Sequence, residues 1–188
     1  GGSVLDFYAA YDQLNRLKNC DAKINVFIKK IAASGGYLLA SIGDTIYGTE
    51  NCVAGSIGVF RSGFNFSKLL ENLSIVYKTY KSCEYKNVGD PFDSITDSVS
   101  EKQQKDVIDI HNRFTATIKK HRKNISDDLF NGDIWYGDDS KKNGLIDEIK
   151  TIDDYIIEKS KSYQIYNVDF SQKSSEKFDF MNLILKLI

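Results

Sequence analysis

Short apolar segments alternate with segments of helical periodicity along most of this chain, and this alternation limits the possible folds more than any other feature of the sequence. Strands are expected at 23–28, 45–47, 74–80 and 163–170, and helices at 5–17, 66–73, 100–122 and 151–159. Segment 32–40 predicts a tight turn into a short helix, and segment 53–60 contains a Gly-Ser-Ile-Gly turn before a further strand. Strands that alternate with helices indicate a layered α/β domain with right-handed crossovers.

The composition fits a globular protein. The chain has 188 residues, of which 41% are hydrophobic, enough to build a core. Its 25 Lys and Arg residues are balanced by 26 Asp and Glu residues, so no basic excess indicates nucleic-acid binding. The three cysteines, Cys20, Cys52 and Cys83, have no CxxC spacing and predict neither a disulfide framework nor a zinc site. No metal and no organic cofactor is expected.

The two ends of the chain differ from the rest. We assign residues 1–170 to one domain and residues 171–188 to a C-terminal extension. Its apolar run 178–188 is shorter than the roughly 20 residues that cross a bilayer, so we expect a docked amphipathic helix, with contact to a membrane surface as the alternative. The chain opens with Gly1 and Gly2, without an initiator Met or a signal-peptide pattern. We therefore expect it to begin inside a loop, with at least one strand and a membrane anchor upstream.

Ser34 is a candidate nucleophile because of the segment in which it lies. It follows a predicted strand and precedes Gly35 and Gly36 at a predicted helix start. A strand end holds a hydroxyl rigidly, and glycines let a substrate backbone come close. Free N–H groups at a helix start stabilise a developing oxyanion. A serine before two glycines is also a common helix cap or turn residue, and that structural interpretation stays open here.

A serine nucleophile needs a base, and the sequence offers few histidines. The two present, His111 and His121, fall in the long charged helix and are interpreted as solvated surface residues, which argues against a Ser-His-Asp triad. A lysine can serve instead if an apolar site brings its pKa down toward neutrality. Composition alone does not select one lysine among the 25 Lys and Arg residues.

Five motifs, in order along the chain, resemble those of the signal peptide peptidase family, which includes SppA and SohB. They are Ala32-Ala33-Ser34-Gly35-Gly36-Tyr37, Gly55-Ser56-Ile57-Gly58-Val59, Glu84-Tyr85-Lys86 with Gly89-Asp90-Pro91-Phe92, Asn131-Gly132-Asp133-Ile134-Trp135-Tyr136-Gly137, and Gly144-Leu145-Ile146-Asp147-Glu148-Ile149. The opening Gly1-Gly2-Ser3-Val4 resembles the end of the family's Ser-Pro-Gly-Gly loop. Trp135-Tyr136-Gly137 and the Thr151-Ile152-Asp153 that follows the last motif look closer to the SohB branch. The resemblance extends from Gly1 to about Phe170 and implies the layered fold of the Clp protease and crotonase group.

The resemblance also implies a role for each residue that matches a motif. Ser34 would be the nucleophile and Lys86 the general base, with Ser56 orienting the lysine. The backbone N–H groups of Gly2 and Gly35 would form the oxyanion hole. An extended substrate would add as a strand beside segment 55–59. The residues expected to contact it are Gly55, Ile57, Gly58, Val59 and Phe60, with Phe64 as a further pocket wall.

The implied function is a serine endopeptidase with residues 1–170 as its catalytic domain. Its substrates would be extended apolar peptides, such as signal peptides left in a membrane. The resemblance further implies a homo-oligomer at the bacterial inner membrane, with the catalytic domain on the extracytoplasmic, periplasmic side. Two alternatives stay open. One is an acyl-CoA hydratase or hydrolase of the crotonase type, and the other is a non-catalytic subunit that binds peptides or scaffolds a membrane assembly.

Overall fold

A computed structural model describes residues 2–20 and 22–168 of the chain. They belong to two compact units, Gly1–Tyr155 and Ile156–Ile188, which are treated separately below. The candidate site lies entirely in the first unit. The helix expected at 178–188 lies outside the described residues.

Two small sheets form the centre of the first unit. One contains β1 (Asn25–Ile28), β3 (Thr45–Gly48) and β6 (Glu148–Ile149), all parallel, in the order β1-β3-β6. The other contains β2 (Ile31–Ala33), β4 (Val53–Gly55) and β5 (Ile134–Tyr136), with β2 parallel and β5 antiparallel to the central β4. The predicted α/β class is therefore confirmed as a mixed helix and strand fold with small sheets.

Six helices and one short 3-10 turn are found among the described residues. They are α1 (Val4–Lys18), α2 (Gly35–Ala40), α3 (Ser67–Asn72), α4 (Asp97–His121), α5 (Gly137–Lys142) and α6 (Ile152–Lys159), with a short 3-10 turn η1 (Asp127–Leu129). Helix α2 contacts both α1 and α4, and α5 packs on β4, β5 and β6. The short strands β2 and β4 are thus held from several sides, which fixes the residues at their ends.

The core forms where the helices meet the strands. Tyr37, Ile46, Ile118 and Leu145 are fully buried there, although they come from four separate parts of the sequence. The hydroxyl of Tyr37 donates a hydrogen bond to the carbonyl oxygen of Leu145 at 2.9 Å, so this buried polar group is satisfied. The core anchors α2 immediately after the candidate nucleophile.

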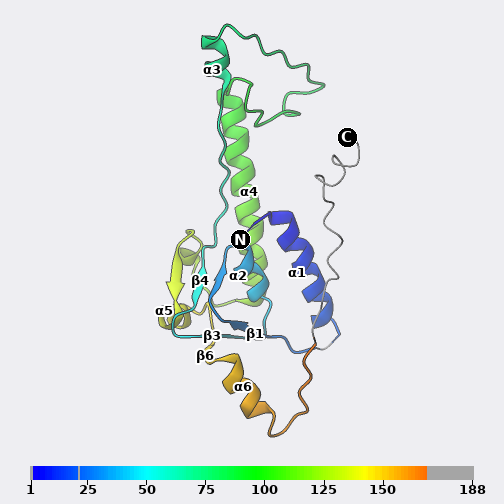
Figure 1. Ribbon diagram of the computed structural model, residues 1–188, viewed down its shortest axis with the longest axis vertical. Helices are drawn as coiled ribbons and strands as arrows, with labels where there is room; N and C mark the ends of the chain where they lie inside the picture. The colour runs from blue at the N-terminus through cyan, green and yellow to red at the C-terminus, as the bar shows by residue number, and fades with distance from the viewer. Residues whose placement is uncertain (1, 21, 169–188) are drawn as a thin grey trace, which may run out of the picture. The chain divides into compact units, whose positions relative to one another are not determined.

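Helix α4 extends well beyond this core. It begins after Thr96, whose hydroxyl accepts a hydrogen bond from the N–H of Val99 and caps the helix. Its buried residues, Phe114, Thr117 and Ile118, all lie in its C-terminal half. Figure 1 shows α3 and the irregular segment 73–96 at the N-terminal end of α4, whereas α2 lies beside its C-terminal half.

Three predicted strands are wrong. The strand expected after the Gly-Ser-Ile-Gly turn does not form, because β4 ends at Gly55 and residues 56–60 are irregular. Segment 74–80 forms no strand, and its apolar side chains Ile75, Val76 and Tyr80 are exposed. A strand needs a neighbouring strand to take its backbone hydrogen bonds, and the N–H of Ile75 instead donates to Leu70 at the end of α3. Segment 163–168 in the second unit is irregular as well. The final two residues of that predicted strand lie outside the described part of the chain.

Candidate active site

Ser34 and Ser56 lie side by side because two parallel strands end at the same level. Ser34 follows β2 and Ser56 follows β4, and the last residues of these strands, Ala33 and Gly55, are paired in the sheet. Neighbouring strands lie about 5 Å apart. The backbone N–H of Ser34 donates to the carbonyl oxygen of Gly55 at 2.8 Å and extends this pairing by one residue. The serines thus share one edge of the sheet although the sequence separates them.

The backbone of Ser34 adopts a conformation that serine rarely accepts. Its φ is 54° and its ψ is −124°, in the left-handed half of the Ramachandran map. The carbonyl oxygen of Ser34 accepts hydrogen bonds from the N–H groups of Tyr37 and Leu38, at 2.9 and 3.1 Å, and these bonds hold the strained turn. The Ser34 side chain does not cap α2. The strained turn therefore presents the hydroxyl rather than using it in the helix cap.

The turn at Ser56 is built in a similar way. Ser56 has a φ of 49°, and its N–H donates to the carbonyl oxygen of Asp133 at 2.6 Å. Gly55 before it has a φ of 116°, and a side chain there would lie 2.7 Å from the ring of Trp135. Only glycine fits both the angle and the space. The glycine of the Gly-Ser-Ile-Gly motif is thus required by the turn itself.

A pocket of about 720 Å³ opens beside these two serines. Its lining residues are Gly2, Val4, Phe7, Tyr8, Ser34, Gly35, Leu38, Ser56, Gly58, Val59, Phe60, Ile110, Phe114, Asn131 and Gly132. None of these side chains is charged, and most are apolar. Such a pocket suits an uncharged side chain of a ligand, because a charged side chain would lose its hydration without gaining a partner.

Most of the residues predicted for the site meet at this pocket. Ser34, Ser56, Gly2 and Gly35 line it, as do Gly58, Val59 and Phe60 from the segment predicted to contact substrate. Two predicted contact residues do not. Ile57 is fully buried in the core, and Gly55 lies within β4 under the Trp135 ring. Phe64 lines a different cavity, beside the segment that carries Lys86.

Lys86 is absent from the lining of the serine pocket. It is exposed, in a turn of segment 73–96. The preceding Tyr85 lies 6.0 Å from the Lys102 ammonium of α4, measured from the ring centroid. Ile110, which lines the serine pocket, is eight residues further along α4, about 12 Å at the helical rise of roughly 1.5 Å per residue. Within one chain, the lysine and the serine pair are therefore at different levels of α4.

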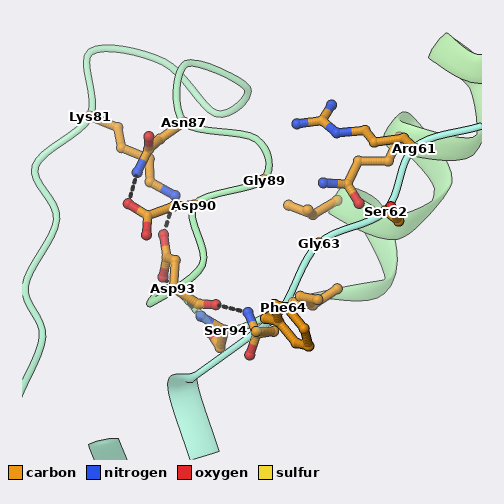
Figure 2. A pocket seen from close by; sticks show the side chains of 14 residues that line it. Arg61, Ser62, Gly63, Phe64, Lys81, Asn87, Gly89, Asp90, Asp93 and Ser94 are labelled. Atoms are coloured by element: carbon orange, nitrogen blue, oxygen red, sulfur yellow. Dashed lines mark hydrogen bonds and ion pairs between the residues drawn. The ribbon is translucent and has the colours of Figure 1, made fainter. Parts of the chain in front are cut away.

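A network of polar side chains holds the turn that contains Lys86. The Asp90 carboxylate accepts hydrogen bonds from the N–H of Phe92, from the Tyr77 hydroxyl at 2.8 Å and from the Asn87 side chain at 2.5 Å. These three bonds, in that order, lower the pKa of Asp90 below its usual range. Figure 2 shows the Asn87–Asp90 bond beside the ion pair of Lys81 with Asp93, whose atoms lie 2.6 Å apart. The turn is thus fixed on both sides of Lys86.

The interpretation of both histidines as solvated surface residues is wrong. His121 is half-buried, and its Nε2 lies 2.7 Å from the Tyr11 hydroxyl of α1. Burial, followed by the positive charges of Lys18 and Lys120, lowers the pKa of His121 below its usual range. His111 is also half-buried, and its Nδ1 is shielded from solvent with no hydrogen-bond partner among the described residues. Neither histidine lines the serine pocket.

The far wall of the pocket was not predicted from the sequence. Phe7 and Tyr8 come from α1, and Ile110 and Phe114 from α4. The spacing of Ile110 and Phe114, four residues apart on one helix face, indicates a shared surface but not the surface it faces. Asn131 belongs to a motif noted above, without a role assigned to it. Helix packing, which brings these residues to Ser34, has no local signal in the sequence.

Neither a metal centre nor a membrane-spanning helix is found among the described residues. Across 2–20 and 22–168, no three His, Cys, Asp or Glu side chains gather as a metal ion would require. No helix in these ranges combines the length and apolar character needed to cross a bilayer.

Comparison with known proteins identifies the family of this chain. Residues 16–165 match the model of peptidase family S49. A relative from Buchnera aphidicola subsp. Acyrthosiphon pisum, named probable protease SohB, is 33% identical over 181 residues, which cover 95% of this chain and 54% of the relative. A protein of the same name from Haemophilus influenzae is 33% identical over 176 residues, 93% of this chain and 50% of that protein.

A third relative, from Enterococcus faecium, is provisionally named signal peptide peptidase SppA. It is 34% identical over 152 residues, 79% of this chain and 44% of its own length. The chain thus spans about half the length of the relatives it matches. The match to the family model covers both strand ends that carry the serines, and this chain belongs to peptidase family S49.

Proposed function

We propose that this chain carries the catalytic site of a serine peptidase that cleaves extended apolar peptides, with Ser34 as nucleophile and Lys86 as general base. The observation that carries the proposal is the pair of serines at two parallel strand ends, facing one uncharged pocket. The strained backbone of Ser34 adds to it, because such strain is concentrated at functional sites.

In the proposed reaction the Ser34 oxygen attacks the peptide carbonyl carbon and its proton passes to a neutral lysine. The N–H groups of Gly35 and Gly2, both at the pocket, would stabilise the oxyanion. The C–N bond then breaks, and the lysine returns the proton to the leaving amine. Water next attacks the acyl-serine ester with the same lysine as base, which releases the carboxylic acid and restores Ser34.

We place the lysine of this mechanism in another copy of the chain, because Lys86 does not line the serine pocket of its own chain. Tyr85, the neighbour of Lys86, contacts Lys102, which precedes the pocket residue Ile110 by eight residues of α4. The same segment exposes Ile75, Val76 and Tyr80, apolar side chains that a neighbouring copy would cover. We propose a homo-oligomer in which Lys86 of the partner subunit reaches Ser34, with Ser56 orienting its amino group.

The substrate class follows from the pocket and from the relatives. A pocket without charged side chains suits apolar residues, and the Enterococcus faecium relative is provisionally named a signal peptide peptidase. We place the substrates among membrane-derived apolar peptides such as cleaved signal peptides. Action at the bacterial inner membrane, on its extracytoplasmic side, belongs to the same proposal. The proposal also includes the layered fold of the Clp protease and crotonase group. The parallel sheet β1-β3-β6 supports this part of it.

The first test is turnover of a fluorogenic apolar peptide by the full-length protein. Ser34→Ala and Lys86→Ala are expected to lower kcat at least 10³-fold, since each removes a reacting group. The control is the double variant His111→Ala with His121→Ala, assayed at a temperature where it stays folded. It should keep near-normal rates, because neither ring lines the pocket. Full activity in Lys86→Ala would overturn the assignment of the base.

A mixing experiment tests whether the base comes from another subunit. Equal amounts of Ser34→Ala and Lys86→Ala chains are unfolded, mixed and assembled together. If the lysine acts across the interface, up to about a quarter of sites regain both groups, because each site takes its serine and its lysine from two chains drawn at random. A lysine that acts within its own chain gives no recovery.

The alternatives are separated by the same assays. Peptide binding without any turnover by the wild-type protein would indicate a binding subunit. A single chain in which Lys86 does not line the serine pocket is also consistent with that alternative. Turnover of an acyl-CoA thioester, with no cleavage of peptides, would indicate the crotonase-type enzyme.

A further inference from the structure

Phe7 of α1 lies against both glycines that flank the candidate nucleophile. A Cβ atom built on Gly35 would lie 2.3 Å from Cδ2 of the Phe7 ring, and one on Gly2 would lie 3.3 Å from its Cε2. The ring therefore packs directly on the backbone of Gly35, next to Ser34. Among the residues that line the pocket, no other side chain contacts both of these glycines in this way.

We propose that Phe7 determines which substrate side chain enters the pocket at the cleavage site, and that it selects small apolar side chains over large ones. The proposal rests on the proposed peptidase function, because it assumes that Ser34 attacks the substrate. The residue whose carbonyl is attacked, P1, has its side chain closest to Ser34. The Phe7 ring occupies the space beside Gly35, the residue that follows Ser34.

The position of Phe7 is fixed by its helix. Its backbone N–H donates to the carbonyl oxygen of Ser3 at 3.2 Å, in the first turn of α1, and its ring packs against the buried core. Helix α1 is in turn held against α2, which begins at Gly35. The ring therefore forms part of a supported wall, and a wall of this kind discriminates side chains by size.

The other lining residues determine which polarity of substrate side chain the pocket accepts, rather than which size it accepts next to Ser34. Leu38, Val59 and Phe114 are apolar, and the Tyr8 hydroxyl lies 3.4 Å from the Thr117 hydroxyl. None of them bears a charge that could pair with an acidic or basic P1 side chain. The pocket as a whole thus favours apolar residues, and Phe7 sets the upper limit of their size at P1.

The test compares the wild-type protein with Phe7→Leu and Phe7→Ala on three fluorogenic tripeptides that differ only at P1, which is Ala, Leu or Phe. The readout is the ratio of kcat/KM for the Phe peptide to that for the Ala peptide. This ratio is independent of the fraction of each variant that is folded, because both substrates meet the same active enzyme. The matched control is Leu5→Ala, an exposed residue of the same helix.

The wild-type protein is expected to prefer Ala at P1. In Phe7→Ala the Phe/Ala ratio should rise about tenfold or more, since even one methylene in an apolar pocket is worth about 10- to 200-fold in specificity. The ratio for Phe7→Leu should lie between those of the wild-type protein and Phe7→Ala. Leu5→Ala should keep the wild-type ratio. A ratio that stays unchanged in both Phe7 variants would overturn the proposal.

Failure of the peptidase function itself would look different. If the wild-type protein cleaves none of the three peptides, their binding to the Ser34→Ala protein is measured by fluorescence anisotropy. If adding Phe7→Ala changes the relative affinity for the Phe and Ala peptides, the role of Phe7 in selecting side chains is supported. The proposed peptidase activity would then be rejected. Unchanged relative affinity would reject both.

Discussion

At the scale of single residues, Gly35 and Gly36 are neighbours with different constraints. A side chain at Gly35 would meet the Phe7 ring at 2.3 Å, whereas one at Gly36 would meet no heavy atom within 4 Å. Gly35→Ala should therefore lower the free energy of unfolding by about 1–3 kcal/mol, as overpacking does. Gly36→Ala should raise it by about 0.5–1 kcal/mol, because alanine favours the helix. Urea unfolding of both variants checks the pair, and equal effects would contradict the close contact with Phe7.

Gly55 gives a second prediction at this scale. Its φ of 116° disfavours alanine, and so does the Trp135 ring, which would lie 2.7 Å from a Cβ atom at this position. Gly55→Ala is expected to lose about 2–4 kcal/mol of stability from backbone strain and steric overlap together. The double variant Gly55→Ala with Trp135→Leu separates the two causes. In the double variant the backbone strain at residue 55 persists, whereas the overlap with the Trp135 ring is relieved.

At the scale of elements, α1 is joined to the end of α4 by the hydrogen bond of Tyr11 to His121. The pKa of His121 is lowered in the folded protein, so the unfolded state binds the proton more tightly. The stabilisation is complete above the unfolded value of about 6.5 and is lost as pH falls through the lower folded value. The free energy of unfolding, measured in urea between pH 7.5 and 5.5, should fall as the pH is lowered. His121→Gln should flatten that slope, and an unchanged slope would contradict the role of His121.

A second joint connects α4 to the loop before β6. The Arg122 guanidinium donates to both oxygens of Asp147, at 2.8 and 2.9 Å, and to the carbonyl oxygen of Gly144. Burial raises the pKa of Asp147, but the bonds from Arg122 and from the Ile46 N–H outweigh it, and the pKa lies below its usual range. Arg122→Lys loses the paired geometry and should cost about 1–2 kcal/mol, measured by urea unfolding at pH 7. Lys142→Arg, an exposed change in α5, is the control.

The helices were predicted from the sequence better than the strands were. Periodicity located α1 and α4 within a few residues, because a helix satisfies its own backbone hydrogen bonds. A strand depends on its neighbours, so the apolar run 74–80 lacks strand structure, and β2 was not separated from the helix turn that follows it. The serine pair was predictable from its motifs. The Phe7 wall was not, because it depends on how α1 packs against α2.

At the scale of the whole molecule, the exposed apolar side chains of segment 73–96 predict an interface between copies. Val76 is 77% and Tyr80 is 92% exposed, in the segment that carries Lys86. Val76→Asp with Tyr80→Asp should shift the protein toward monomers and lower turnover together, since the lysine would no longer reach a neighbouring serine. Analytical ultracentrifugation and peptide turnover measure the two effects. Leu17→Asp, exposed on α1, is the control. Monomers with full turnover would contradict the shared site.

The position of Lys86 outside the serine pocket of its own chain has a consequence for the life of the protein in the cell. If each active site takes its lysine from a neighbouring copy, a newly made chain is inactive until it associates with another. No propeptide or inhibitor is then needed to protect the cell during synthesis. Proteolysis would then depend on local abundance, rising more steeply than the concentration of the chain and ceasing on dilution.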